Sequence, residues 1–254
     1  AFAASSIHPS SFSLHPSAAW PTFRGDRQRS GSVDRVVPVP THLVWQSEDL
    51  GAAVPQATTG DGMVFTCDKD TYTVFALSAE TGDLTWSYQA GGRVDSPPTW
   101  HAGRIYFGSA DGFVYCLSAS DGRLVWRLRA APEPRQIGAF DRLESVWPVH
   151  GSVLIQTDPK TGKAELFCVA GRSSFLDGGI HLLRIDPHDG SILAEKAVDH
   201  RDPETGAELA VAANFEQDGC LNDILSGDGQ SVYLRHARFS SIDFERIESD
   251  SHLY

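Results

Sequence analysis

The chain has 254 residues, of which 41% are hydrophobic and 21% charged, as expected for a globular protein with a substantial core. Its formal net charge of −12 repels phosphate backbones, so no nucleic-acid partner is predicted. No apolar run approaches the roughly 18 residues of a membrane-spanning helix, so no membrane span is predicted either.

The N-terminal region, residues 1–19, is rich in serine, alanine, proline and histidine and contains no aspartate, glutamate, lysine or arginine. It lacks the basic start and apolar middle of a secretory signal. We therefore predict a poorly ordered tail over 1–19 and a folded region from 20 to 254.

A phrase of twelve residues recurs about every 40 residues along the folded region. The segment from Phe75 to Trp86 matches the segment from Tyr115 to Trp126, and a third copy ends at Ala194 instead of tryptophan. Such a period of short alternating segments is typical of a β-propeller, in which each repeat is one four-stranded blade. The predicted fold class is all-β, a β-propeller of four-stranded antiparallel blades with WD40-like architecture.

The strands of each repeat follow from alternating hydrophobicity and from turn residues. The expected strands are 63–67, 73–77 and 84–88, then 104–108, 113–117 and 124–128, then 165–170, 180–185 and 192–198. Before the third repeat, an insertion at about 131–144 contains two prolines and is predicted to be a loop.

These units divide the chain into a locking strand at 41–47, three full blades at about 53–88, 94–129 and 145–199, and part of a fourth at about 222–254. Closed propellers have about 4–8 blades, so we predict a partial ring. An open array exposes strand edges and apolar surface. We therefore expect a protein partner, or the remainder of the ring, to cover them.

Three tryptophans occupy the predicted outer strands: Trp45, Trp86 and Trp126. Each ring is expected to pack between adjacent blades, with its N–H reaching a neighbouring backbone carbonyl. Ala194 stands in the equivalent place of the third blade and is expected to weaken one such contact.

The segment Ala110–Leu117, followed by Asp121-Gly122 and Trp126, resembles the pyrroloquinoline-quinone-like (PQQ-like) repeat. Residues 20–26 with 29–31 resemble the lead-in before the first blade of bacterial members, and 171–179 resembles a segment of long bacterial members. The family is similar both to quinoprotein alcohol dehydrogenases and to the propeller lipoprotein of the outer-membrane β-barrel assembly machine. The resemblance implies a bacterial, extracytoplasmic location.

The same resemblance raises the question of a cofactor. Quinoprotein dehydrogenases need calcium held by carboxylate and amide oxygens, a catalytic aspartate and usually a disulfide beside the quinone. The chain has no vicinal cysteines, and Asn214 and Asn222 are its only asparagines. We predict no catalytic residue, no metal ligand and no cofactor, with PQQ and calcium as the alternative. A disulfide between Cys67 and Cys116 is left open, because spacing does not decide it.

Binding residues are sought in the irregular third unit, because insertions between blades lie at the ring faces. The candidates are His150, Arg172, Asp177, His200 and Asp202. Arg172 could grip a carboxylate or phosphate. We favour the alternative that Arg172 and Asp177 pair within their own loop, since Asp-Gly-Gly loops mostly close turns.

The function favoured by these patterns is a non-catalytic scaffold or binding module for proteins or small ligands. One alternative is a quinoprotein-type oxidoreductase, or a propeller attached to a catalytic part not in this chain. Another is carbohydrate binding through Trp100 and Trp147, although both are better explained as core aromatics. No G-x-S-x-G, P-loop or G-x-G-x-x-G motif points to a further activity.

Overall fold

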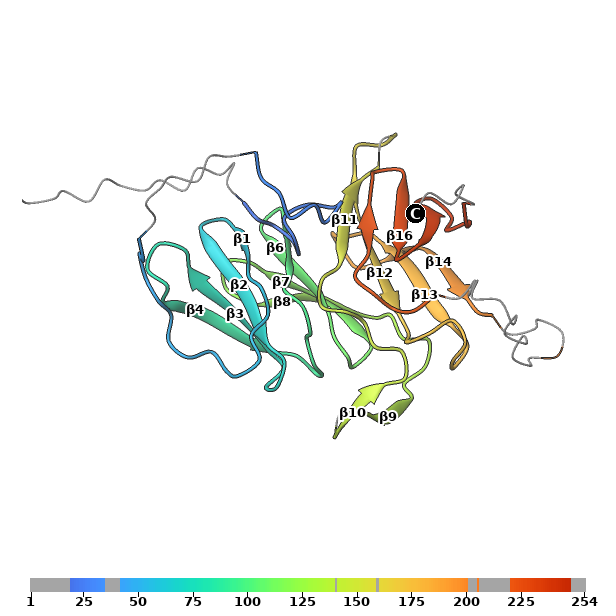
Figure 1. Ribbon diagram of the computed structural model, residues 1–254, viewed down its shortest axis with the longest axis horizontal. Coiled ribbons are helices and arrows are strands. Elements are labelled where there is room, and N and C mark those ends of the chain that lie inside the picture. The colour runs from blue at the N-terminus through green and yellow to red at the C-terminus, as the bar shows by residue number, and fades with distance from the viewer. Residues whose placement is uncertain are drawn as a thin grey trace, which may run out of the picture.

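The computed structural model describes residues 19–34, 42–139, 141–158, 160–200, 205 and 220–247. Regular secondary structure in these ranges is entirely β (Figure 1). The strands are β1 Thr58–Gly60, β2 Met63–Asp68, β3 Thr73–Ser78, β4 Leu84–Gln89, β5 Thr99–His101, β6 Arg104–Gly108, β7 Phe113–Ser118, β8 Leu124–Arg129, β9 Gln136–Ala139, β10 Arg142–Ser145, β11 Leu154–Thr157, β12 Ala164–Ala170, β13 Ile180–Ile185, β14 Ile192–Val198, β15 Ser226–Gly227, β16 Ser231–Leu234 and β17 Ala237–Ser240. The described segments include no helix long and apolar enough to cross a membrane.

Four antiparallel sheets stand side by side as blades, which confirms the predicted propeller as a partial ring (Figure 1). Three sheets are four-stranded, in the orders β1-β2-β3-β4, β5-β6-β7-β8 and β11-β12-β13-β14, and the fourth is β15-β16-β17. Their inner strands contact one another in the order β1, β5, β11 and β15. The blades therefore stack around a common axis, with apolar side chains filling the space between neighbouring sheets.

The repeated phrase corresponds to a repeated backbone geometry. Strands three and four of each complete blade share a register shift, at Ala76/Leu77, Cys116/Leu117 and Arg184/Ile185. The hairpin turn that follows contains a glycine with φ of +79°, +70° and +79° at Gly82, Gly122 and Gly190. Glycine adopts these angles without steric cost, which is why the phrase keeps it.

The tryptophans of one blade lie over the turn glycines of the next. The indole Nε1 atoms donate to Ala79 O at 2.9 Å from Trp45, to Ala119 O at 2.9 Å from Trp86 and to Pro187 O at 3.1 Å from Trp126. A Cβ atom added at the turn glycine would collide with each ring. Trp45 makes this contact from an irregular segment, since residues 42–57 form no strand. This differs from the strand predicted at 41–47.

The contact between the third and fourth blades reverses these roles. Ala194 occupies the tryptophan position, while Phe244 occupies the glycine position of the fourth-blade turn, with φ of +57°. Phe244 N donates to Ser240 O at 3.1 Å, as Gly82 N does to Ser78 O in the first blade. The Phe244 ring is fully buried in an apolar cluster that also contacts Ala194. An aromatic ring therefore crosses this interface from the opposite blade.

The insertion before the third blade contains a hairpin, so the prediction of a loop over 131–144 was wrong. Strands β9 and β10 pair from Gln136↔Ser145 to Ala139↔Arg142. Asp141 takes a φ of +60° in the turn. The hairpin is a separate two-stranded sheet that projects from one end of the blades (Figure 1).

The segment from Trp20 to Arg29 lies along the inner strands, an arrangement that sequence patterns did not predict. Backbone N–H groups of the blades donate to it: Thr59 N to Trp20 O at 2.8 Å, Trp100 N to Pro21 O at 2.7 Å and Gly227 N to Arg27 O at 2.8 Å. The segment therefore satisfies inner-strand donors of three different blades.

Arg29 connects this segment to the remaining inner strands. Its guanidinium donates to Leu225 O at 3.0 Å, Val153 O at 3.2 Å and Phe23 O at 3.1 Å, and also to Thr22 Oγ1. Burial lowers the pKa of Arg29 to about 10, against the raising effect of the nearby Asp26 charge. The buried Arg29 guanidinium thus connects the residues just before β11 and β15 by bonds to their neutral carbonyls.

Candidate functional site

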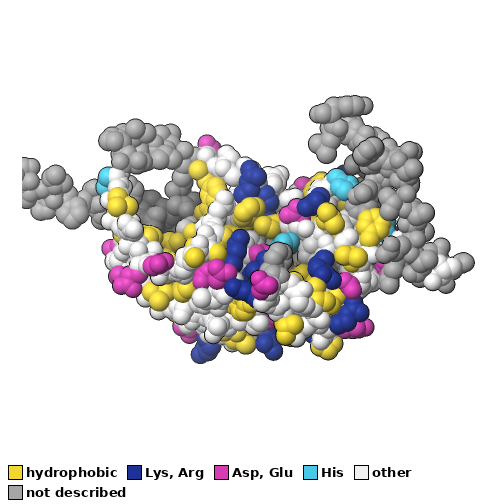
Figure 2. All heavy atoms as spheres, turned by 60° about the horizontal axis from the view of Figure 1, so that its bottom comes forward, with side chains coloured by type: hydrophobic (Ala, Val, Ile, Leu, Met, Phe, Trp, Pro, Cys, Tyr) yellow, Lys and Arg dark blue, Asp and Glu magenta, His cyan; other side chains and the backbone are white. Residues whose placement is uncertain are grey.

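One end of the blades collects the loops that carry the candidate residues. Backbone bonds join three of these loops, from Ala110 N to Arg93 O, from Ser145 N to Ala110 O and from Val149 N to Ser109 O. We call this end the loop face and define it by residues 69–72, 90–98, 109–112, 130–139, 141–151 and 171–179. Figure 2 brings this end forward and shows side chains of both charges gathered at its centre.

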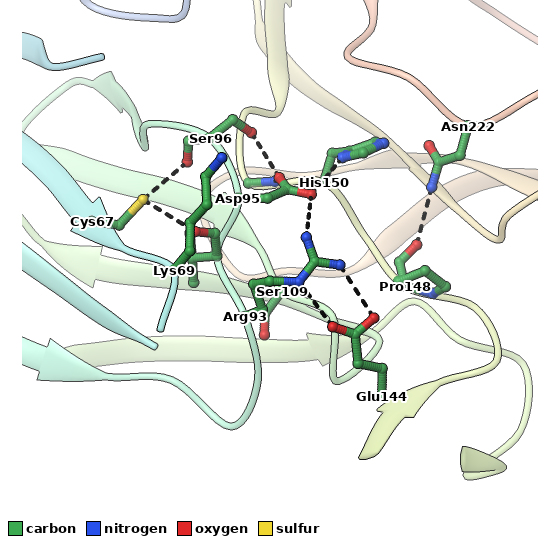
Figure 3. A network of polar contacts seen from close by, with 12 residues as sticks. Cys67, Lys69, Arg93, Asp95, Ser96, Ser109, Glu144, Pro148, His150 and Asn222 are labelled. Carbon is green, nitrogen blue, oxygen red and sulfur yellow. Dashed lines mark hydrogen bonds and ion pairs between the residues drawn. The ribbon is translucent and has the colours of Figure 1, made fainter. Parts of the chain in front are cut away.

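The β9–β10 hairpin is fastened across the loop face by two charged side chains. Arg142 donates to Asp70 O at 2.8 Å and to Asp70 Oδ1 at 3.0 Å, and its guanidinium lies 5.1 Å from the centre of the Tyr72 ring. Glu144 is buried and accepts two bonds from Arg93, at 2.8 and 3.2 Å (Figure 3). The hairpin is thereby connected to the first blade and to the loop that leads into the second.

His150 is held by Asp95, which comes from the loop between the first two blades (Figure 3). His150 Nδ1 lies 2.8 Å from Asp95 Oδ2, while Asp95 Oδ1 accepts from Gly151 N at 2.9 Å. Arg93 lies 3.5 Å from the same carboxylate. Burial opposes ionisation of Asp95, but the bonds and charges of these partners outweigh it and bring its pKa to about 2.

The pKa of His150 shifts in the opposite direction. Burial favours the neutral imidazole, yet the hydrogen bond and charge of Asp95 outweigh burial and raise the pKa above its usual 6.5. Nearby Asp223 adds to the increase. Each group thus favours the charged form of the other, which describes a structural ion pair better than a proton-transfer pair.

The His150–Asp95 pair predicts a specific pH dependence of stability. His150 contributes fully below pH 6.5, its unfolded pKa, and this contribution is lost as pH rises through the raised folded pKa. The Asp95 contribution is present above pH 3.8 and is lost as pH falls toward about 2. We expect His150→Gln to flatten the decrease in stability as pH rises above 6.5 in urea titrations. His188→Gln, at an exposed turn, is the matched control, and an unchanged slope in His150→Gln would contradict the prediction.

Asp177 lies between two arginines from different loops. Its Oδ2 accepts from Arg172 at 2.6 Å, within the same 171–179 loop, and its Oδ1 accepts from Arg135 at 2.6 Å. The structure therefore brings Arg172 and Asp177 together as a pair that closes their own loop. His200 makes a separate contact, with its ring 5.1 Å from that of Phe175. Asp202 lies outside the described residues.

A cavity of about 540 Å³ opens beside Asp177. Such a volume suits a small ligand or a side chain of a partner. The cavity is lined by Pro132, Glu133, Arg135, Trp147, Asp177, Gly178 and His181, and we call it the Asp177 pocket. Sequence patterns missed Glu133, Arg135 and His181, although the Pro-Glu-Pro-Arg insertion signalled an exposed loop near the site.

The two tryptophans considered for carbohydrate binding do not share a site. Trp147 is 4% exposed and lines the Asp177 pocket. Trp100 donates to Asp61 Oδ2 at 3.2 Å and lines a different cavity, against the segment that carries Arg29. The two rings therefore form no joint platform for a sugar.

The metal-ligating side chains and the cysteines bear on the alternative of PQQ and calcium. No three histidine, cysteine, aspartate or glutamate side chains come together in the described part of the chain as metal ligands. All four cysteines are buried and free, so the Cys67–Cys116 disulfide is not formed. Burial raises the pKa of Cys67 to about 12 and that of Cys116 to about 11, so these thiols are protonated at neutral pH.

Comparison with known proteins gives one family and two kinds of relative. A family model described as outer membrane protein assembly factor BamB matches residues 29–217. The dehydrogenase subunit of alcohol dehydrogenase (quinone) from Gluconobacter oxydans (strain 621H) is 34% identical over 74 residues, which are 25% of this chain and 10% of that protein. Outer membrane protein assembly factor BamB from Nitrosomonas eutropha (strain DSM 101675 / C91 / Nm57) is 25% identical over 111 residues, which are 43% of this chain and 26% of that protein.

A solved structure gives the same architecture. Quinohemoprotein alcohol dehydrogenase from Comamonas testosteroni superposes with a TM-score of 0.55 and 17% identity, over 74% of this chain and 28% of that one. At this identity the likeness concerns the fold alone. The matches span only a tenth and about a quarter of the two curated relatives' lengths.

Proposed function

The chain belongs to the PQQ-like repeat propeller family, whose matching model is described as outer membrane protein assembly factor BamB, and from this premise we propose a non-catalytic scaffold. Its loop face binds a protein or a small ligand. The names of its relatives support a bacterial, extracytoplasmic setting, since an outer-membrane assembly factor works outside the cytoplasm. Propellers supply a rigid ring with variable loops, which suits recognition.

The observation that carries this proposal is the state of the charged groups on the loop face. Arg93 with Glu144, His150 with Asp95, and Arg172 with Asp177 are each engaged in pairs that hold loops together. A catalytic group would instead be poised toward an open site with a pKa matched to proton transfer. Of these paired residues, Asp177 also lines the open Asp177 pocket, which offers a site for contact.

Placement of a photo-crosslinking residue tests the proposal. We expect p-benzoylphenylalanine at exposed Glu133, on the pocket rim, to give discrete adducts with envelope proteins of the source bacterium. The same residue at exposed Arg123, in the β7–β8 turn at the opposite end of β7, is the matched control. Equal adducts at both positions, or none at Glu133, would contradict a binding role for the loop face.

The alternative, a quinoprotein-type oxidoreductase or a propeller attached to a catalytic part, is favoured by one observation. The quinone-dependent alcohol dehydrogenase shares 34% identity over 74 residues. In that case the blades would supply the framework around the cofactor. Added PQQ with Ca²⁺ is expected to leave the melting temperature unchanged, whereas an increase of several degrees would favour the alternative.

A further inference from the structure

We propose that the Asp177 pocket recognises a cationic side chain of a protein partner, and that Arg135 occupies the place of that cation in the free chain. The proposal rests on the binding role of the loop face and adds the chemistry of what is bound there. It is carried by the contacts of Arg135, by the rigidity of the groups around it and by the charge of the pocket.

Arg135 is held as a bound guanidinium ligand would be. Its guanidinium carbon lies 4.9 Å from the centre of the Trp147 ring, and its Nη2 donates to Asp177 Oδ1 at 2.6 Å. An aromatic face combined with a carboxylate is a common way to bind guanidinium and ammonium groups. Even so, the Arg135 side chain is 50% exposed, and its neighbours in 132–136 are exposed as well. It can therefore leave the pocket without unpacking the core.

The partners of Arg135 are held in place independently of it. Asp177 keeps its ion pair with Arg172 through Oδ2 at 2.6 Å, which leaves Oδ1 for a second cation. Trp147 is 4% exposed and meets the His181 ring edge-on, with the centroids 6.4 Å apart. His181 is in turn 3.0 Å from Glu195. The acceptor and the aromatic face would thus persist once Arg135 moved away.

Trp147 differs from the blade tryptophans in a way that supports this role. Trp45, Trp86 and Trp126 each donate their indole N–H to a carbonyl. Within the described segments, Trp147 Nε1 has no hydrogen-bond partner. The indole instead meets a polar group through its ring face, which the Arg135 guanidinium covers.

The charge of the pocket favours a cation over an anion. With Arg135 displaced, Glu133 and Asp177 remain on the lining, and Arg172 balances only one of them. The whole chain carries a formal charge of −12, which attracts cationic partners over longer distances. A carboxylate ligand would instead compete with Asp177 for the two arginines that Asp177 already bridges.

An internal occupant weakens the apparent affinity for an external one. The ligand binds only to the fraction of molecules in which Arg135 has moved out, so the dissociation constant rises by the reciprocal of that fraction. One half-exposed ion pair and one cation–π contact hold Arg135 in place. Removing it is expected to tighten binding of a guanidinium ligand by about tenfold.

Calorimetric titration of the whole chain with N-acetyl-L-arginine methylamide tests this. We expect Arg135→Ala to bind this probe about tenfold more tightly than the unaltered chain does, and Arg135→Met to show a smaller gain. Arg129→Ala removes the same charge from an exposed position on β8 and is the matched control, with no gain expected. Adding Asp177→Asn to Arg135→Ala should abolish the gain, and the uncharged N-acetyl-norleucine methylamide should bind none of the variants measurably. Arg135→Met guards against local collapse because its aliphatic stem still covers Trp147, so its gain reports the release of Asp177 alone.

The proposal is overturned if neither Arg135 variant gains affinity, if Arg129→Ala gains equally, or if N-acetyl-glutamate methylamide binds the unaltered chain and is lost in Arg135→Ala. The last result would identify an anion site. Failure here is distinguishable from failure of the proposed function. Adducts confined to Glu133 without any gain in Arg135→Ala would keep the binding face and reject its preference for cations.

Discussion

Replacing Arg29 with methionine is expected to lower the free energy of unfolding by about 3–5 kcal/mol. Methionine fills a similar volume, so the loss would come from polar groups and not from a cavity. Three backbone carbonyls, at Phe23, Val153 and Leu225, and the Thr22 hydroxyl lose a charged donor in a buried place. Unpaired buried acceptors are costly because water does not replace the lost donor.

Urea unfolding followed by tryptophan fluorescence measures this loss. Arg27→Met is the matched control, because Arg27 lies in the same segment, is exposed and uses its backbone carbonyl to accept from Gly227. We expect the control to change stability by no more than about 0.5 kcal/mol. A loss below about 1 kcal/mol in Arg29→Met would show that the carbonyls find other donors.

Exchanging the roles of Ala194 and Phe244 is expected to show strong coupling across the interface of the third and fourth blades. Phe244→Gly alone removes a fully buried ring and should cost about 3–5 kcal/mol, less about 1 kcal/mol because glycine tolerates the φ of +57°. Ala194→Trp alone overfills the interface, because the Phe244 ring is already there, and should cost about 1–3 kcal/mol.

The double variant Ala194→Trp with Phe244→Gly recreates the tryptophan-over-glycine arrangement seen at Trp126 and Gly190. Its loss should be smaller than the sum of the single losses by about 2–3 kcal/mol, which a double-mutant cycle of unfolding free energies measures. If the two changes prove additive, the two residues do not substitute for each other, and the equivalence drawn from backbone geometry is wrong.

Features that repeat along the chain were predictable from sequence. The period, the turn glycines and the outer-strand tryptophans show up because each recurs in a fixed local context. The pairing of Arg172 with Asp177 was also within reach, since the two residues are five positions apart. The propeller and one local contact of the site follow from such short-range patterns.

Features that depend on a single long-range contact were not predictable. The β9–β10 strands have four residues each, with a glycine in β9, and their sequence carries little strand signal. Their anchors, Arg142 to Asp70 and Glu144 to Arg93, join residues 72 and 51 positions apart. Arg29 reaches Leu225 across 196 positions. No repeat or local spacing marks such pairs, so the hairpin, the Arg29 hub and the Asp177 pocket emerged only from coordinates.

The reversed pair at Ala194 and Phe244 also bears on how the blades find their neighbours. Because consecutive blades share sequence, each one risks docking against the wrong copy while the chain folds. A blade that ends in tryptophan would clash with Phe244, and a blade that ends in Ala194 would leave a void against a glycine turn. The interface between the third and fourth blades therefore disfavours misordered stacking, because only the third blade fits against the fourth.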